Sequence, residues 1–89
     1  MARFTVRVLQ TDMEKHKEEF AVELVQAKYL TIGQPRLVSR AIKLAMDSEY
    51  GGTHHCIVGK TFGSCVTYRS GSFILMEINQ TTFMIFEAD

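Results

Sequence analysis

The sequence predicts an α+β fold in which one strand is followed by two helices and then four strands, in the order β-α-α-β-β-β-β. Three observations support this prediction. A short segment near the start alternates apolar and polar residues, as a half-buried strand does. Two central segments carry apolar residues at helical intervals, and the alternation returns from His54 to the end of the chain.

The first strand and the first helix follow from residue spacing. In FTVRVL, residues 4–9, apolar side chains alternate with Thr5 and Arg7. The following TDME, residues 11–14, has the spacing of a capping box. We therefore expect a helix from about residue 13 to residue 29. Its apolar stripe consists of Phe20, Ala21, Leu24, Val25 and the stem of Lys28.

A second helix is predicted to begin at Pro35, because the first helical position has no hydrogen-bonded N–H to lose. The glycine pair after Tyr50 predicts its end. One face is apolar and consists of Leu37, Val38, Ala41, Ile42 and Ala45. Most of the charged residues lie off that face: Arg36, Arg40, Lys43, Asp47 and Glu49.

Four strands are predicted in the second half. In the first of them, from residue 54, His54 and Cys56 share one face and His55 points the other way. A second strand covers residues 62–68, and two more cover 72–78 and 81–86. Asn79 and Gln80 join the last two in a tight hairpin, in which Asn79 can adopt a positive φ. No internal repeat or linker divides the chain, so residues 1–89 are expected to form one domain.

Composition excludes several classes of function. The 89 residues include 10 Lys and Arg and 10 Asp and Glu, a balance that argues against a nucleic-acid or membrane partner. No apolar run is long enough to cross a bilayer, and the start lacks the pattern of a signal peptide. Two cysteines without paired spacing are expected to be reduced thiols in the cytosol. A chain this short has a thin core, so help from a second chain is expected.

The segment HHCIVGKTFGSC, residues 54–65, contains residue types that can carry chemistry. A phosphate loop would need glycine at His54 and a helix after Thr61, where a strand is predicted. A zinc site would need more convergent ligands than His54 and Cys56 with Cys65 or His16. A Cys56–His54 nucleophile and base would lack an orienting third group. We therefore expect no enzyme activity, no metal and no cofactor.

The same segment closely resembles the small dynein light chain family, together with DSEYGGT before it and SFILMEINQTTFMIFEAD near the end. The resemblance runs along the whole chain without a gap. The matching residues of the central block are Tyr50, His55, Cys56, Ile57, Val58, Gly59, Phe62, Gly63, Ser64, Val66 and Thr67.

The resemblance implies a non-enzymatic homodimer in which two helices pack on each antiparallel sheet. The strand at residues 62–67 would cross to the partner's sheet, and its free edge would bind extended peptides as an added strand. The implied partners are a second copy of the chain and disordered segments of the dynein intermediate chain, or other proteins with TQT-like motifs. The implied location is cytoplasmic, on the microtubule cytoskeleton with the dynein motor.

The resemblance, with the alternation of the strands, also implies two sets of site residues. The peptide-binding residues would be Arg36, Lys60, Thr61, Phe62, Gly63, Ser64, Cys65, Val66, Thr67, Tyr68, Phe73, Leu75, Glu77, Thr82 and Met84. The dimer-interface residues would be His55, Ile57, Gly59, Phe62, Ser64 and Val66.

Departures from the family pattern cluster around the expected groove. The family usually has Trp at His54, Tyr at Cys65, Leu75 and Glu77, and His at Tyr68. The other departures are Pro35, Thr61 and Asn79. Two functions therefore stay open: a peptide-binding dimeric hub of the motor, and a structural dimerisation protein that no longer binds the usual peptides.

Overall fold

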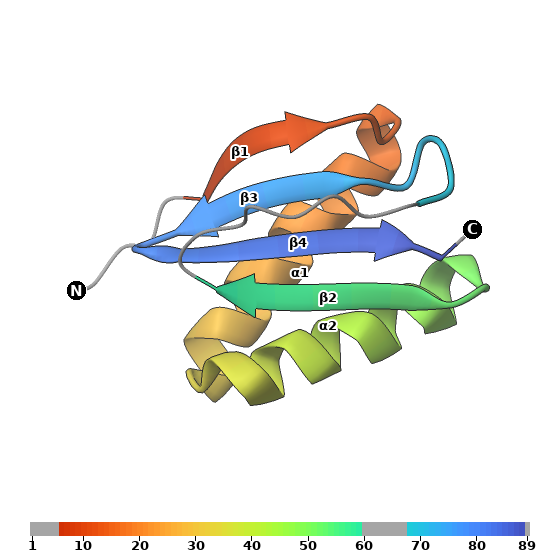
Figure 1. Cartoon of the computed structure of the whole chain (residues 1–89). Helices are drawn as coiled ribbons and strands as arrows, with labels where there is room; N and C mark the ends of the chain where they lie inside the picture. The colour runs from red at the N-terminus through yellow and green to blue at the C-terminus, as the bar shows by residue number, and fades with distance from the viewer. Residues whose placement is uncertain (1–5, 60–67, 89) are drawn as a thin grey trace.

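A computed structural model describes residues 6–59 and 68–88, in which two helices cover one face of an antiparallel sheet (Figure 1). The elements are β1 (Val6–Thr11), α1 (Lys15–Ile32), α2 (Pro35–Tyr50), β2 (His54–Gly59), β3 (Ile74–Ile78) and β4 (Thr81–Glu87). The strand order across the sheet is β1-β3-β4-β2. The predicted α+β class is confirmed. The predicted strand at 62–68 lies outside the described residues except for Tyr68, which bridges to Ala88.

The turn from β1 into α1 differs from the prediction. Thr11 ends β1 instead of capping the helix, and α1 starts at Lys15 after Glu14. The Thr11 hydroxyl donates to the Phe73 carbonyl at 2.9 Å and accepts the Met13 N–H at 3.0 Å. The capping-box prediction was therefore wrong, because the sheet and the turn already use this side chain.

The helices bury one side against the sheet. In α1 the buried residues are Ala21 and Val25, and the helix continues to Ile32, where Gly33 follows with φ 82°. In α2 they are Val38, Ile42 and Met46, at intervals of four. Leu37 is 53% exposed, so its predicted place in the stripe was wrong. It lies about 100° around the helix from Val38, the first residue of the buried row.

The strands separate two apolar clusters. On the helix-covered face, Ile74, Met76 and Ile78 of β3 and Phe83 and Ile85 of β4 are fully buried in the main core. On the opposite face Phe73, Met84 and Phe86 form a second cluster. The predicted hairpin is confirmed: Asn79 has φ 55° and connects β3 to β4.

Candidate functional site

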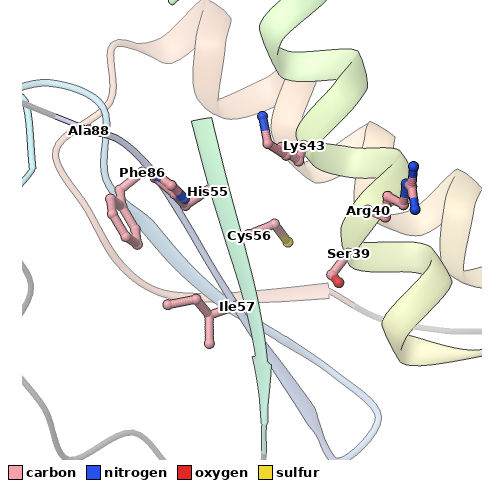
Figure 2. A pocket seen from close by; sticks show the side chains of 8 residues that line it. All are labelled: Ser39, Arg40, Lys43, His55, Cys56, Ile57, Phe86 and Ala88. Atoms are coloured by element: carbon pink, nitrogen blue, oxygen red, sulfur yellow. The ribbon is translucent and has the colours of Figure 1, made fainter. Parts of the chain in front are cut away.

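The β2 strand is an edge strand of the sheet and lies beside α2. It pairs with β4, from His54 opposite Glu87 to Gly59 opposite Thr82, and no described strand pairs with its other edge. An open groove of about 430 Å³ lies here (Figure 2). Its lining residues are Ser39, Arg40, Lys43, His55, Cys56, Ile57, Phe86 and Ala88. A free strand edge beside a groove can accept another strand through backbone hydrogen bonds.

Side chains alternate along β2 as predicted. His54 is fully buried, Cys56 packs against the main core, and His55 and Ile57 are exposed. Figure 2 shows Cys56 pointing toward α2, with His55 beside Phe86 on the other side of the strand. The His55 and Phe86 rings stack with centroids 5.3 Å apart. The exposed side of β2 therefore continues the apolar face of the sheet.

That outer face brings together many of the residues expected to bind a peptide or a second copy. Leu75 lies opposite Met84, which lies opposite Ile57 on the next strand. Tyr68 stacks on Phe73 with ring centroids 4.8 Å apart. The result is a buried apolar cluster on β3 and β4, which Ile57 continues to the edge at β2 as an exposed side chain.

The charge of the groove is positive. Arg40 forms no ion pair with a described residue, whereas Lys43 lies 2.5 Å from the Asp47 carboxylate. Burial raises the pKa of the Cys56 thiol to about 12. A protonated thiol is a poor nucleophile. The groove therefore offers backbone edges and a guanidinium, which suit binding better than covalent chemistry.

The other described residues that were predicted to bind a peptide do not line the groove at β2. Arg36 lies in the first turn of α2 and lines a small groove with Gln34, Leu37 and Arg40. Glu77 pairs with Arg7 at 3.2 Å, so its charge is compensated within the chain. Thr82 is buried between the positions of Glu77 and Gly59. Residues 60–67, which include Lys60, Thr61, Phe62, Gly63, Ser64, Cys65, Val66 and Thr67, lie outside the described residues.

His54 and Asp47 form a partly buried contact that the sequence did not predict. His54 Nδ1 lies 2.9 Å from Asp47 Oδ1, which also accepts the His54 backbone N–H at 2.6 Å. Burial alone would raise the pKa of Asp47, but hydrogen bonds from Lys43 and His54 outweigh it and lower the pKa to about 2. The carboxylate is thus charged and holds the start of β2 against the end of α2.

Residues 6–59 and 68–88 contain neither a metal-binding cluster nor a membrane-spanning helix. No group of three or more His, Cys, Asp or Glu side chains in these ranges is arranged to hold a metal ion. Neither helix in these ranges is long and apolar enough to cross a membrane.

Sequence reasoning missed Phe86 and the α2 side of the groove. Phe86 shares the parity of Thr82 and Met84 in β4, so strand alternation could have found it. Ser39 and Arg40 gave no such signal, because their place beside β2 depends on how α2 packs on the sheet.

Comparisons with known proteins agree with this fold. A family model described as "Dynein light chain type 1" matches residues 5–88. The Caenorhabditis elegans protein "Probable dynein light chain 2, cytoplasmic" is 32% identical over 87 residues, which cover 98% of this chain and 97% of that protein. The Saccharomyces cerevisiae protein "Dynein light chain 1, cytoplasmic" is 40% identical over 52 residues, which cover 58% of this chain and 56% of that protein.

A solved structure adds a likeness of fold. The dynein light chain-like domain of a Fasciola hepatica calcium binding protein superposes with a TM-score of 0.81 at 13% identity. The match covers 94% of this chain and 92% of that one. This likeness concerns the fold; the family model over residues 5–88 and the full-length relative show that the chain belongs to the dynein light chain family.

Proposed function

We propose that this dynein light chain works as a non-enzymatic homodimer that binds extended peptide segments by strand addition and so pairs partner chains. The observation that carries the proposal is the free edge of β2 beside the groove at α2, which can take a strand of the second copy and so extend the sheet toward a peptide. Backbone hydrogen bonds at a sheet edge give general affinity, and side-chain pockets give selectivity. The relatives named as cytoplasmic dynein light chains support a cytoplasmic role in the dynein complex.

In the proposed dimer, residues 62–67 of one chain pair with the β2 edge of the other. The peptide then adds to the outer edge of that crossed strand, near Arg36 and Arg40 on α2. The exposed residues at the β2 end of the outer face, His55 and Ile57, pack against the second copy. Two identical peptide sites hold two partner chains side by side, and this linkage raises avidity without new contacts.

Isothermal titration calorimetry with a TQT-containing peptide of the dynein intermediate chain type tests this function. We expect saturable binding with one peptide per chain. The variant Arg40→Glu reverses a charge at the groove and should weaken binding about two- to fivefold, as expected of an exposed ion pair. Glu49→Gln, an exposed change elsewhere on α2, is the matched control.

Dimer formation without peptide binding would favour the second candidate, a structural dimerisation protein. The buried His54 and the paired Glu77 lie where the family usually has Trp and Tyr, so residues that the resemblance places around the peptide site differ chemically from those of other members. A titration that gives no heat at millimolar peptide, from a dimer in solution, would overturn the peptide-binding part of the proposal.

A further inference from the structure

The β1 strand forms the other end of the sheet, across from β2 (Figure 1). β1 pairs only with β3 among the described strands, so the N–H and C=O groups on its second edge have no strand partner there. A bulge between Val8 and Gln10 interrupts the pairing with β3. The regular part of the free edge is therefore the segment from Val6 to Val8.

A second groove runs between this edge and α1. Its volume is about 400 Å³, and its lining residues are Val8, Lys15, Glu18, Glu19, Val22 and Glu23. Val8 and Val22 pack against the main core and form an apolar floor. The groove therefore combines a free strand edge, which offers backbone hydrogen bonds, with an apolar floor and a charged helical wall that can select alternate side chains.

The charge of the wall identifies the occupant. Three carboxylates stand against one ammonium, and none of Glu18, Glu19 and Glu23 forms an ion pair with a described residue. Glu19 and Glu23 are four residues apart on the helix, a spacing at which like charges destabilise it. A basic ligand would relieve that repulsion. The groove at β2 has the opposite sign, because Arg40 and Lys43 line it.

We propose that the β1 edge is a second strand-docking site, which takes an extended basic segment of a partner protein. This site is separate from the proposed peptide groove at β2 and does not depend on it. The added strand would pair with residues 6–8 and place every second side chain over α1, toward Glu19 and Glu23. The side chains between them would lie on the outer face beside Arg7, where a positive charge is disfavoured.

The proposed pattern is therefore two basic residues separated by one neutral residue. A suitable probe is a fluorescently labelled, capped peptide of sequence Thr-Thr-Lys-Val-Lys-Thr-Thr. The matched control peptide, Thr-Thr-Lys-Lys-Val-Thr-Thr, has the same composition, but a strand cannot place both of its lysines on one face. We expect the first peptide to bind the full chain more tightly, with an affinity that falls as salt is added.

The protein side of the test is the double variant Glu19→Gln with Glu23→Gln. Both side chains are exposed, and the change removes a like-charge pair, so the fold should be kept. We expect the dissociation constant of the alternating peptide to rise about two- to tenfold. Glu49→Gln on α2 should leave it unchanged. Backbone amide shifts in NMR should move at residues 6–8 and in the first half of α1.

Three outcomes would overturn the proposal. The first is no binding at millimolar peptide. The second is equal affinity for the two peptides, or for the parent and the double variant. The third is a set of amide shifts confined to the β2 edge, which would assign the peptide to the other groove.

Discussion

His54 is a fully buried polar residue whose ring is fixed by one carboxylate. Because a carboxylate only accepts hydrogen bonds, Nδ1 carries the hydrogen that faces Asp47. Nε2 has no hydrogen-bond partner among the described residues, and its nearest charged neighbour is Glu87 at 3.9 Å. Asp47 therefore satisfies one ring nitrogen of the buried histidine, and Lys43 compensates the charge of Asp47.

The lowered pKa of Asp47 predicts acid sensitivity. A group whose pKa falls on folding, here from 3.8 to about 2, stabilises the folded state above pH 4 and loses that effect as pH falls toward 2. Asp47→Asn should reduce the free energy of unfolding by about 1–3 kcal/mol at neutral pH. The difference between the two proteins should shrink between pH 4 and pH 2. Thermal unfolding at a series of pH values measures it.

Glu49→Gln is the control for this prediction, because Glu49 is exposed on the same helix. A stability difference between parent and Asp47→Asn that stays constant from pH 5 to pH 2 would show that ionised Asp47 contributes nothing specific.

At the scale of elements, Asp12 connects the end of β1 to the turn before β3. Its carboxylate accepts the Gly71 N–H at 3.0 Å and the Phe73 N–H at 2.9 Å. Asp12→Ala would leave both donors without this partner, at a cost of about 1–3 kcal/mol in urea unfolding. Asp12→Asn keeps one acceptor oxygen, so its free energy of unfolding should lie between that of the parent and that of Asp12→Ala. Parent-like stability of Asp12→Ala would contradict this role.

The β3–β4 hairpin depends on the left-handed backbone of Asn79, at φ 55°. Asn79→Val forces a branched side chain into that conformation and should cost about 1–2 kcal/mol. Asn79→Gly should stay within about 0.5 kcal/mol of the parent, because glycine adopts positive φ freely. Chemical unfolding of both variants measures the difference. Equal losses in the two would instead point to the hydrogen bond from Asn79 to the Tyr29 hydroxyl.

Periodicity predicted the existence and the order of the described elements, because most of them bury one side more deeply than the other. The exception is β4, which is buried on both sides from Thr82 to Phe86. The start of α2 at Pro35 and the Asn79 turn follow from backbone chemistry and were predicted correctly. The end of β1 and the start of α1 were not, since Thr11 takes part in a contact with Phe73 from a distant part of the chain. The Asp47–His54 contact spans only seven residues and was missed because it depends on how the chain turns from α2 into β2.

For the whole molecule, the two ends of the sheet differ in charge although the chain has no net charge. Arg40 and Lys43 flank the free edge of β2, and Glu18, Glu19 and Glu23 flank that of β1. Between them the outer face carries the second apolar cluster, whose Phe73, Met84 and Phe86 are buried within one chain. Ile57 at the β2 end of that face stays exposed, so a second chain would bury apolar surface there, where a small domain gains most from a partner.

Analytical ultracentrifugation of the full chain tests the proposed homodimer most directly. A homodimer gives a species of about twice 10.1 kDa at micromolar concentration, and this is the expected result. His55→Lys should give a folded monomer of 10.1 kDa, because His55 lies exposed on the outer face and a lysine would bring two ammonium groups into the interface. A parent protein that stays folded at 10.1 kDa at all concentrations would contradict the proposed homodimer.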